Sequence, residues 1–297
     1  MSWHVVGDWG TTRLRLFRMM DGAVVERLEG PGIGALTDPP GVHLNRLLAQ
    51  WAHHGRPDHV LLCGMAGARG ALAEVPYTAC PVDRAGWRAG TCSLDLDSLP
   101  VRIAPGVRAE DRDVMRGEET QIFGAMALDP ALAQGRQLFI LPGTHSKWVW
   151  TDNGSIADFR TWFTGELFGL LRDHSTLFKA KAEAGDAVDM VTGWEDGLGR
   201  VRQGGGPLGA LFEARAAQLL RGRSLAWAEA YLSALLIGTE VEEGSRHHAL
   251  PKAVVLIGAP ALAERYERIL ADRAVVVRPM DGDRCVLAGL ELLNDLD

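Results

Sequence analysis

Length, composition and charge restrict the classes of protein to which this chain can belong. The 297 residues suit two domains of about 150 residues each, and 47% hydrophobic with 23% charged residues predicts ordered globular structure throughout. The formal net charge of −7 argues against nucleic acid or an anionic membrane as the main partner. The amino terminus does not resemble a signal peptide and the apolar runs are too short to span a bilayer, so we expect a cytoplasmic protein.

The cysteines fit the same compartment. Cys63, Cys80, Cys92 and Cys285 show no CxxC spacing. We therefore expect free thiols rather than disulfides or a structural zinc site.

The amino-terminal segment predicts three antiparallel strands. A strand ends near Val6, the polar loop 8–12 follows, and a second strand runs through the alternating Leu14 and Leu16. Asp21-Gly22 suits a primed hairpin turn into a third strand. Further along, the chain predicts a helix from Val42 to His53 and a buried strand from His59 to Cys63.

The same arrangement returns after the middle of the chain. Leu138 to Leu141 is an apolar strand, and the polar turn Pro142-Gly143-Thr144-His145-Ser146 leads into a second strand. Asp152-Asn153-Gly154 then turns into a third, from Ser155 to Phe159. Two units with one layout indicate an internal duplication. We expect their loops to face one another across a cleft.

The carboxy-terminal segment reads as a β-α-β unit with parallel strands. Its parts are a strand from Ala253 to Ile257, a helix from Pro260 to about Leu270 and a strand from Val275 to Val277. A last helix from Arg284 to Asn294 follows. The apolar helix Leu225 to Val241 is interpreted as core packing, with Gly238 allowing close approach of a helix or a nucleotide.

The two polar loops are the candidate phosphate sites. Glycine adds no side chain, so backbone amides and threonine hydroxyls can approach a phosphate closely. An ordinary hairpin turn is the alternative for either loop alone, and the presence of two matching loops favours phosphate binding. Asp8, at the end of an apolar strand, could hold Mg²⁺ directly or through water, or could cap its own turn.

Four motifs, in this order, resemble the 2-dehydro-3-deoxygalactonokinase family. They are Asp8-Trp9-Gly10-Thr11-Thr12, Met115-Arg116-Gly117-Glu118-Glu119-Thr120-Gln121, Leu141 to Trp148, and Phe159-Arg160-Thr161 through Thr164-Gly165-Glu166-Leu167. With Ile257-Gly258 and Gly282-Asp283, the resemblance covers essentially the whole chain.

The resemblance implies an α/β, two-lobed actin-like ATPase (ribonuclease H-like) fold with duplicated mixed-sheet domains. It also implies ATP-dependent phosphorylation of 2-dehydro-3-deoxy-D-galactonate at its terminal hydroxyl, with Mg²⁺. The lobes are expected at residues 1–113 and 114–280, with residues 281–297 as a terminal helix at the hinge. The implied phosphate and nucleotide contacts are Asp8, Gly10, Thr11, Thr12, Gly143, Thr144, His145, Ser146, Gly258 and Ala259. Ala259 departs from the paired glycines usual at the adenosine segment.

Phosphoryl transfer needs a group that accepts or orients the proton of the sugar hydroxyl. Asp113, Glu118 and Glu119 are the candidates, and Glu118 is favoured, with Glu119 next. Acidic residues in the first turn of a helix can instead complement the helix dipole. His145 is a phosphate contact or a structural hydrogen-bond donor, and is not assigned as the base.

The carboxylate of a sugar acid calls for an arginine, whose planar fork binds it through two hydrogen bonds. Arg160 and Arg69 are the candidates, and Thr164 and Glu166 are further substrate contacts implied by the resemblance. The pairs His53-His54 and His247-His248 are interpreted as solvated surface, because adjacent residues on a helix point apart.

Two other functions stay open. A phosphohydrolase of the same fold would use water in place of the sugar, and a sugar-acid sensor would bind without catalysis. A kinase forms ADP only when a sugar acid is present. The phosphohydrolase forms ADP without the sugar acid, and the sensor forms none. The expected partners are the sugar acid and ATP, and a homodimer is an assembly compatible with the sequence.

Overall fold

The computed structural model describes residues 2–179 and 182–294. They form two compact units. Of the described residues, unit 1 comprises 2–139, 149–160 and 280–294, and unit 2 comprises 140–148, 161–179 and 182–279. This division differs from the expected boundary at residue 113, since residues 114–139 belong to unit 1. The reason is the helix α3 (Glu118–Leu128), which packs in unit 1 against the carboxy-terminal helix α9 (Gly282–Glu291).

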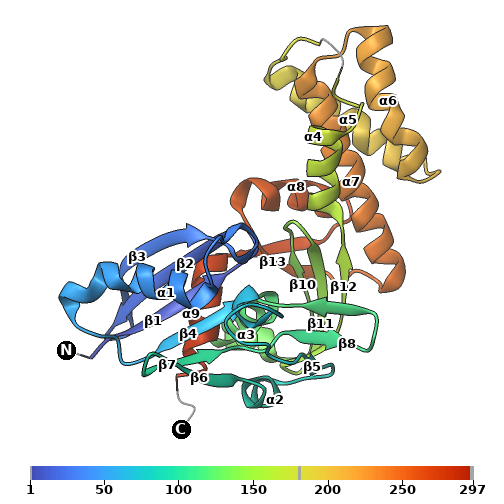
Figure 1. Ribbon diagram of the computed structural model, residues 1–297. Coiled ribbons are helices and arrows are strands. Elements are labelled where there is room, and N and C mark those ends of the chain that lie inside the picture. Colours follow the sequence, from blue (N-terminus) through green and yellow to red (C-terminus); the bar gives the residue numbers. More distant parts are fainter. Residues whose placement is uncertain (1, 180–181, 295–297) are drawn as a thin grey trace. The chain divides into compact units, whose positions relative to one another are not determined.

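A six-stranded sheet of order β3-β2-β1-β4-β7-β6 organises unit 1 (Figure 1). Its strands are β1 His4–Trp9, β2 Arg13–Met20, β3 Ala23–Pro31, β4 Val60–Gly64, β6 Cys92–Leu96 and β7 Leu99–Ile103. The first three are antiparallel neighbours, as the predicted hairpin arrangement requires, and β4 is parallel to β1. Trp9, Leu14, Leu16 and Leu62 are fully buried, so one face of the sheet forms the core.

Shorter elements complete unit 1. The predicted helix from Val42 divides into α1 (Pro40–Leu48) and the 3₁₀ helix η2 (Ala49–His54). Sequence reasoning did not predict the small sheet β5-β8-β9 or the helix α2. These and the remaining short segments are β5 Thr78–Ala79, β8 Val107–Ala109, β9 Asp113–Met115, α2 Arg84–Ala89, η1 Ile33–Ala35, η3 Met65–Gly67 and η4 Pro130–Ala133.

Helices α3 and α9 touch through their backbones. A Cβ on Gly124 would lie 1.8 Å from the carbonyl oxygen of Cys285, and one on Gly289 would lie 2.0 Å from that of Thr120. No side chain fits at either glycine. The position of α3, which begins with the two candidate acids, is therefore fixed by the last helix of the chain.

The second sheet has the order β12-β11-β10-β13-β14. Its strands are β10 Arg136–Leu141, β11 Ser146–Asp152, β12 Ser155–Trp162, β13 Ala253–Ile257 and β14 Val276–Met280. The orders β3-β2-β1-β4 and β12-β11-β10-β13 place three consecutive strands beside a fourth in the same way. The predicted duplication of the strand-loop-strand units is confirmed.

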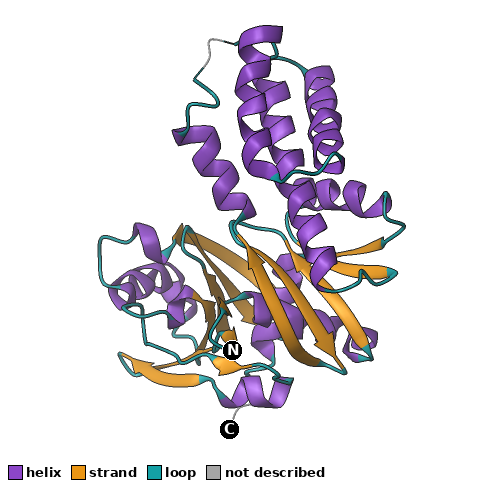
Figure 2. Ribbon diagram, turned by 90° about the vertical axis from the view of Figure 1, so that its right-hand side faces the viewer, coloured by secondary structure: helices purple, strands orange, loops and turns teal. Residues whose placement is uncertain are grey.

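Helices dominate unit 2 (Figure 2). They are α4 Thr164–His174, α5 Ala187–Arg202, α6 Pro207–Arg221, α7 Leu225–His247 and α8 Pro260–Ala271. A Cβ on Gly238 of α7 would lie 3.0 Å from Val201 of α5, so Gly238 permits close helix packing as predicted. Among the described helices, none has the length and apolar character needed to cross a membrane.

Candidate functional site

The first loop lies between β1 and β2, and the backbone amides of Ile33 and Gly34 donate hydrogen bonds to its carbonyl groups. The Gly10 amide donates to the Arg13 carbonyl at 2.8 Å, and the amides of Ile33 and Gly34 donate to the carbonyls of Gly10 and Thr11 at 3.1 and 2.9 Å. The side chains of Thr11 and Thr12 are exposed. The loop therefore presents its hydroxyl groups outward from a fixed backbone.

Asp8 lies on β1 directly opposite Arg15 of β2. The Arg15 guanidinium donates to the carboxylates of both Asp8 and Asp283. Burial alone would lower the pKa of Arg15, but the two carboxylates outweigh it and raise the pKa. Arg27 Nη1 also pairs with Asp283 Oδ2 at 3.3 Å, so the two carboxylates face two guanidinium groups.

Three chain segments of unit 1 meet beside Asp8. A Cβ on Gly64, at the end of β4, would lie 2.7 Å from the Trp9 carbonyl oxygen and 3.3 Å from Asp8 Oδ1. A Cβ on Gly117 would lie 3.4 Å from the Gly64 Cα. Both glycines have positive φ, +74° and +112°, where other residues are strained. The end of β1, the end of β4 and the start of α3 are thus brought together by glycine.

The two candidate acids at the start of α3 have different environments. Glu119 is fully buried, and its two oxygens accept from the Gly117 amide at 2.9 and 2.8 Å. Burial, with the charge of Glu118 adding to it, raises the pKa of Glu119 to about 8. Glu118 is half-buried, and its Oε2 accepts from the Arg116 amide at 3.0 Å. Glu119 therefore acts in the structure as a buried helix cap, whereas Glu118 is accessible.

The predicted arginines lie in unit 1. Arg69 is exposed in the loop after η3, and Arg160 is half-buried on β12. A third arginine, Arg116, anchors the neighbouring loop by donating to the Val75 carbonyl at 2.7 Å and stacking over Tyr77 at 4.2 Å.

The second loop, between β10 and β11, belongs to unit 2 and packs against the start of α4. A Cβ on Gly165 would lie 2.2 Å from the Gly143 carbonyl oxygen. The Glu166 amide donates to the Thr144 carbonyl at 2.8 Å, and the His145 ring pairs with the Glu166 carboxylate at 2.6 Å. Predicted phosphate and substrate residues thus lie side by side here.

Behind this loop, the carboxylate of Glu240 on α7 accepts four side-chain hydrogen bonds. Oε1 accepts from Ser146 Oγ at 2.7 Å and Trp148 Nε1 at 2.8 Å. Oε2 accepts from Thr164 Oγ1 at 2.5 Å and Tyr266 OH at 2.7 Å. Burial raises the pKa of Glu240, while these hydrogen bonds oppose the increase.

The interpretation of α7 as core packing missed Glu240, because one acidic residue in an apolar helix gives no signal of its partners. Ser146 is fully buried and its hydroxyl donates to Glu240. Its role visible in the structure is therefore to hold the loop from inside. A direct phosphate contact by Ser146 stays a prediction.

A cavity of about 340 Å³ adjoins the second loop within unit 2. Its lining mixes polar and apolar residues, which are Gly143, Thr144, Thr164, Gly165, Phe168, Ser233, Leu236, Ile237, Leu262, Arg265 and Tyr266. Gly258 and Ala259 are outside this lining and lead into α8, and a Cβ on Gly258 would lie 3.4 Å from Pro142.

Comparison with known proteins identifies relatives over nearly the whole chain. Residues 8–293 match the family model described as 2-keto-3-deoxy-galactonokinase. A 2-dehydro-3-deoxygalactonokinase from Escherichia coli (strain K12) is 31% identical over 292 residues, which cover 97% of this chain and 96% of that protein. A Rhizobium meliloti (strain 1021) protein described by the same activity is 36% identical over 300 residues, covering 97% and 95%.

Solved structures agree with the fold. A crystal structure of a Sinorhizobium meliloti protein assigned to the 2-dehydro-3-deoxygalactonokinases has a TM-score of 0.84 at 34% identity, covering 98% of this chain and 97% of the other. Component A of (R)-2-hydroxyglutaryl-CoA dehydratase from Acidaminococcus fermentans, at 14% identity and a TM-score of 0.53, shares the fold. The expected actin-like ATPase fold is confirmed.

Proposed function

The chain belongs to the 2-keto-3-deoxy-galactonokinase family, and from this membership we propose that it transfers the terminal phosphoryl group of ATP to the 6-hydroxyl of 2-dehydro-3-deoxy-D-galactonate. The products are the 6-phosphate and ADP. The full-length match, which includes each motif singled out from the sequence, carries the proposal. The two strand-loop-strand units, each with glycine and threonine in its loop, support it chemically.

We assign the adenosine of ATP to the cavity of unit 2. Leu236, Ile237 and Leu262 give it apolar walls suited to a planar base. Gly143 and Thr144 line the same cavity, and the backbone amides of this loop suit phosphate. Gly258 and Ala259 remain proposed nucleotide contacts, since they connect β13 to the helix that carries Leu262.

The residues around Asp8 fit a magnesium ion held through water. Mg²⁺ prefers oxygen ligands and keeps several waters, and the Asp8 carboxylate on β1 offers such oxygens beside the first loop. When bound, the ion would neutralise charge on the phosphates. Gly10, Thr11 and Thr12 are the proposed phosphate contacts of the first loop.

Glu118 is the proposed catalytic base, because it is the accessible acid at the start of α3. The 6-hydroxyl oxygen forms a bond to the γ-phosphorus while the bond from that phosphorus to the β,γ-bridging oxygen breaks. The hydroxyl proton passes to the Glu118 carboxylate. Glu119, whose two oxygens accept from the Gly117 amide, holds the start of α3 rather than taking the proton.

Arg160 and Arg69 are proposed as partners of the substrate carboxylate, and Thr164 and Glu166 as further substrate contacts. The pairing of Glu166 with His145 gives that carboxylate a fixed orientation. His145 is proposed as a phosphate contact.

The test is ADP release with a panel of acceptors. The panel contains 2-dehydro-3-deoxygalactonate, its gluconate epimer, neutral hexoses and no sugar. We expect strong preference for the keto-deoxy acids and dependence on Mg²⁺. ADP release without any sugar would indicate the phosphohydrolase, and equal activity on neutral hexoses would reject the sugar-acid assignment.

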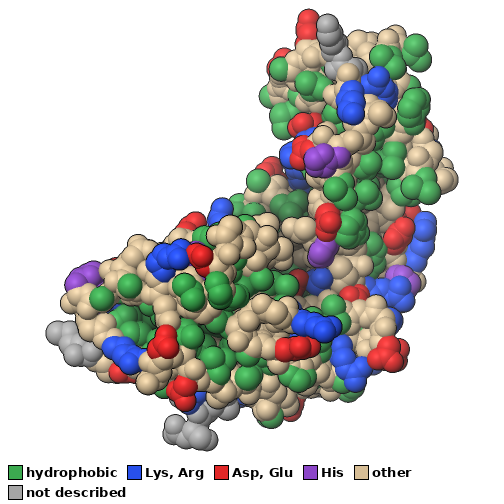
Figure 3. All heavy atoms as spheres, viewed as in Figure 1, with side chains coloured by type: hydrophobic (Ala, Val, Ile, Leu, Met, Phe, Trp, Pro, Cys, Tyr) green, Lys and Arg blue, Asp and Glu red, His purple; other side chains and the backbone are tan. Residues whose placement is uncertain are grey.

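We also propose a cytoplasmic homodimer. The cytoplasm supplies ATP, and the four cysteines are free. Leu208, Phe212, Leu219 and Leu220 of α6 are each at least 60% exposed, and apolar side chains are visible over the helices of unit 2 (Figure 3). Such patches are rare on monomers. Sedimentation should show a dimer that Phe212→Glu with Leu219→Glu dissociates, and a monomeric parent protein would reject the assignment.

A further inference from the structure

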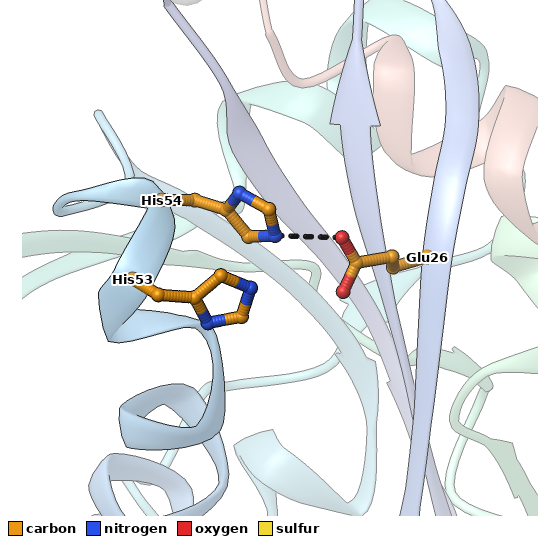
Figure 4. A group of neighbouring side chains, drawn as sticks. All are labelled: Glu26, His53 and His54. Atoms are coloured by element: carbon orange, nitrogen blue, oxygen red, sulfur yellow. Dashed lines mark ion pairs between the residues drawn. The ribbon is translucent and has the colours of Figure 1, made fainter.

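Three metal-binding side chains converge in unit 1 outside the proposed kinase site. Glu26 lies on β3, and His53 and His54 end the 3₁₀ helix η2 (Figure 4). Each offers one ligand atom, and the three atoms lie within 4.8 Å of one another. His53 and His54 are exposed, as the sequence-based interpretation expected. Their rings do not point apart, however, because the two residues end a 3₁₀ helix, and their ring centroids lie 3.8 Å apart.

The backbone positions of these ligands are fixed by the core. Buried Trp51 anchors η2, and Trp3 Nε1 donates to the His54 carbonyl at 3.2 Å. On the sheet, Arg18 lies opposite Glu26 and donates to its Oε1 at 2.7 Å. The same oxygen pairs with His54 Nε2 at 2.7 Å. Both sides of the cluster are therefore held in place before any ion arrives.

We propose that Glu26, His53 and His54 bind a divalent transition-metal ion, with zinc as the best fit. Two imidazoles and one carboxylate suit Zn²⁺, whereas Mg²⁺ and Ca²⁺ prefer oxygen ligands alone. Oε2 of Glu26 is the assigned oxygen ligand, because Oε1 already accepts from Arg18. The contact of Oε1 with His54 Nε2 is given up when that nitrogen binds the ion. Water completes the coordination, since the side chains of Glu26 and His54 are 36% and 29% exposed.

Binding requires small movements and the loss of a proton. Ligand atoms of a tetrahedral zinc ion lie about 3.4 Å apart. The three ligand atoms now lie within 4.8 Å of one another, so the exposed side chains must rotate to bring them closer. Any ring proton on the coordinating nitrogen of a histidine is released to solvent as the metal bond forms. The guanidinium of Arg18 repels the ion, so we expect a Kd on the order of micromolar rather than that of a four-ligand structural site.

The site is distinct in chemistry from the proposed magnesium site, where Asp8 and Asp283 offer oxygen alone. An ion here would join η2 to β3 across the outer edge of the sheet. Since it binds the folded chain, it would raise the melting temperature of the protein.

The experiment is titration of the full, metal-free chain with Zn²⁺ by isothermal calorimetry, and with Co²⁺ by visible absorption. We expect one zinc ion per chain, a Co²⁺ spectrum without thiolate charge-transfer bands, and a higher melting temperature with zinc. Glu26→Gln, His53→Ala and His54→Ala should each weaken binding at least about tenfold.

His247→Ala, which alters the other adjacent histidine pair, is the matched control and should bind as the parent chain does. Circular dichroism reports whether each variant is folded, and the conservative Glu26→Gln keeps the test valid if a histidine variant unfolds. Absence of zinc binding, or equal binding by the parent and all folded variants of the three ligands, would overturn the proposal.

Discussion

Removing the carboxylate of Glu240 is the most informative perturbation of the second loop. In Glu240→Ala the indole N–H of Trp148, which can only donate, loses its acceptor inside the protein. The hydroxyl of Tyr266 loses its 2.7 Å bond to the carboxylate and keeps only a long contact, 3.4 Å, to Ser146 Oγ. Each buried unpaired donor costs about 1–3 kcal/mol, and the space left by the side chain adds to this.

The net loss is smaller than that sum, because the variant no longer buries a carboxylate. We expect about 3–5 kcal/mol of lost stability, seen as a melting temperature lower by on the order of 5–10 °C. Glu240→Gln should lose only about 1 kcal/mol, since its amide oxygen can face Trp148 and Ser146 while its NH₂ group donates to the hydroxyls of Thr164 and Tyr266.

The same substitution should loosen Ser146 and Thr164, which flank the second loop. We therefore expect Glu240→Ala to raise the KM for ATP about tenfold, with Glu240→Gln close to the parent enzyme. Glu242→Ala is the control, because that residue makes only partly exposed ion pairs worth about 0–1 kcal/mol. If Glu240→Ala melts and binds ATP as Glu242→Ala does, the carboxylate does not hold the loop and the reasoning fails.

Three further predictions concern unit 1. Glu118→Gln should lower kcat by about 10²–10⁴-fold in the ADP-release assay while ATP binding survives, and near-parent turnover would reject Glu118 as the base. The pKa of Glu119 is raised to about 8 in the folded protein. The contribution of Glu119 to the stability of the fold is therefore complete below pH 4.5 and is lost as the pH rises toward 8. Stability should thus fall by at most about 1.4 kcal/mol per pH unit across this window, and Glu119→Gln should flatten that slope in denaturation series, whereas an unchanged slope would contradict the burial argument. Of Arg160→Ala and Arg69→Ala, the variant that loses the contact with the substrate carboxylate should raise KM for the sugar acid without changing KM for ATP. If neither variant changes KM for the sugar acid, neither arginine binds the carboxylate.

Local patterns predicted the strands and loops of the duplicated units well. Alternating apolar residues and the Asp-Gly and Asn-Gly turns depend on neighbours along the chain, so Leu14, Asp21 and Gly154 could be interpreted from sequence alone. The order of the four motifs also identified the family, which the comparisons bear out.

Contacts between distant residues escaped this reasoning. Glu240 lies 94 positions after Ser146, and neither residue type signals the other. Glu26 and His54 likewise meet only after η2 folds against the sheet. Glu118 and Glu119 are the same residue type, so the sequence could not distinguish them. The structure does so by showing that Glu119 is fully buried.

The backbone contact of α3 with α9 bears on how this protein is made. Unit 1 begins at the amino terminus, yet Gly124 and Gly289 must meet before α3 is seated, and Asp283 must arrive before Arg15 has both of its carboxylates. At about 5–20 residues per second, a ribosome needs on the order of 10–30 s to translate from one helix to the other. In the emerging first half of the chain, α3 therefore stays unanchored until the final residues have left the ribosome. A chain that stops short of α9 would carry Glu118 and still fail to hold it in place.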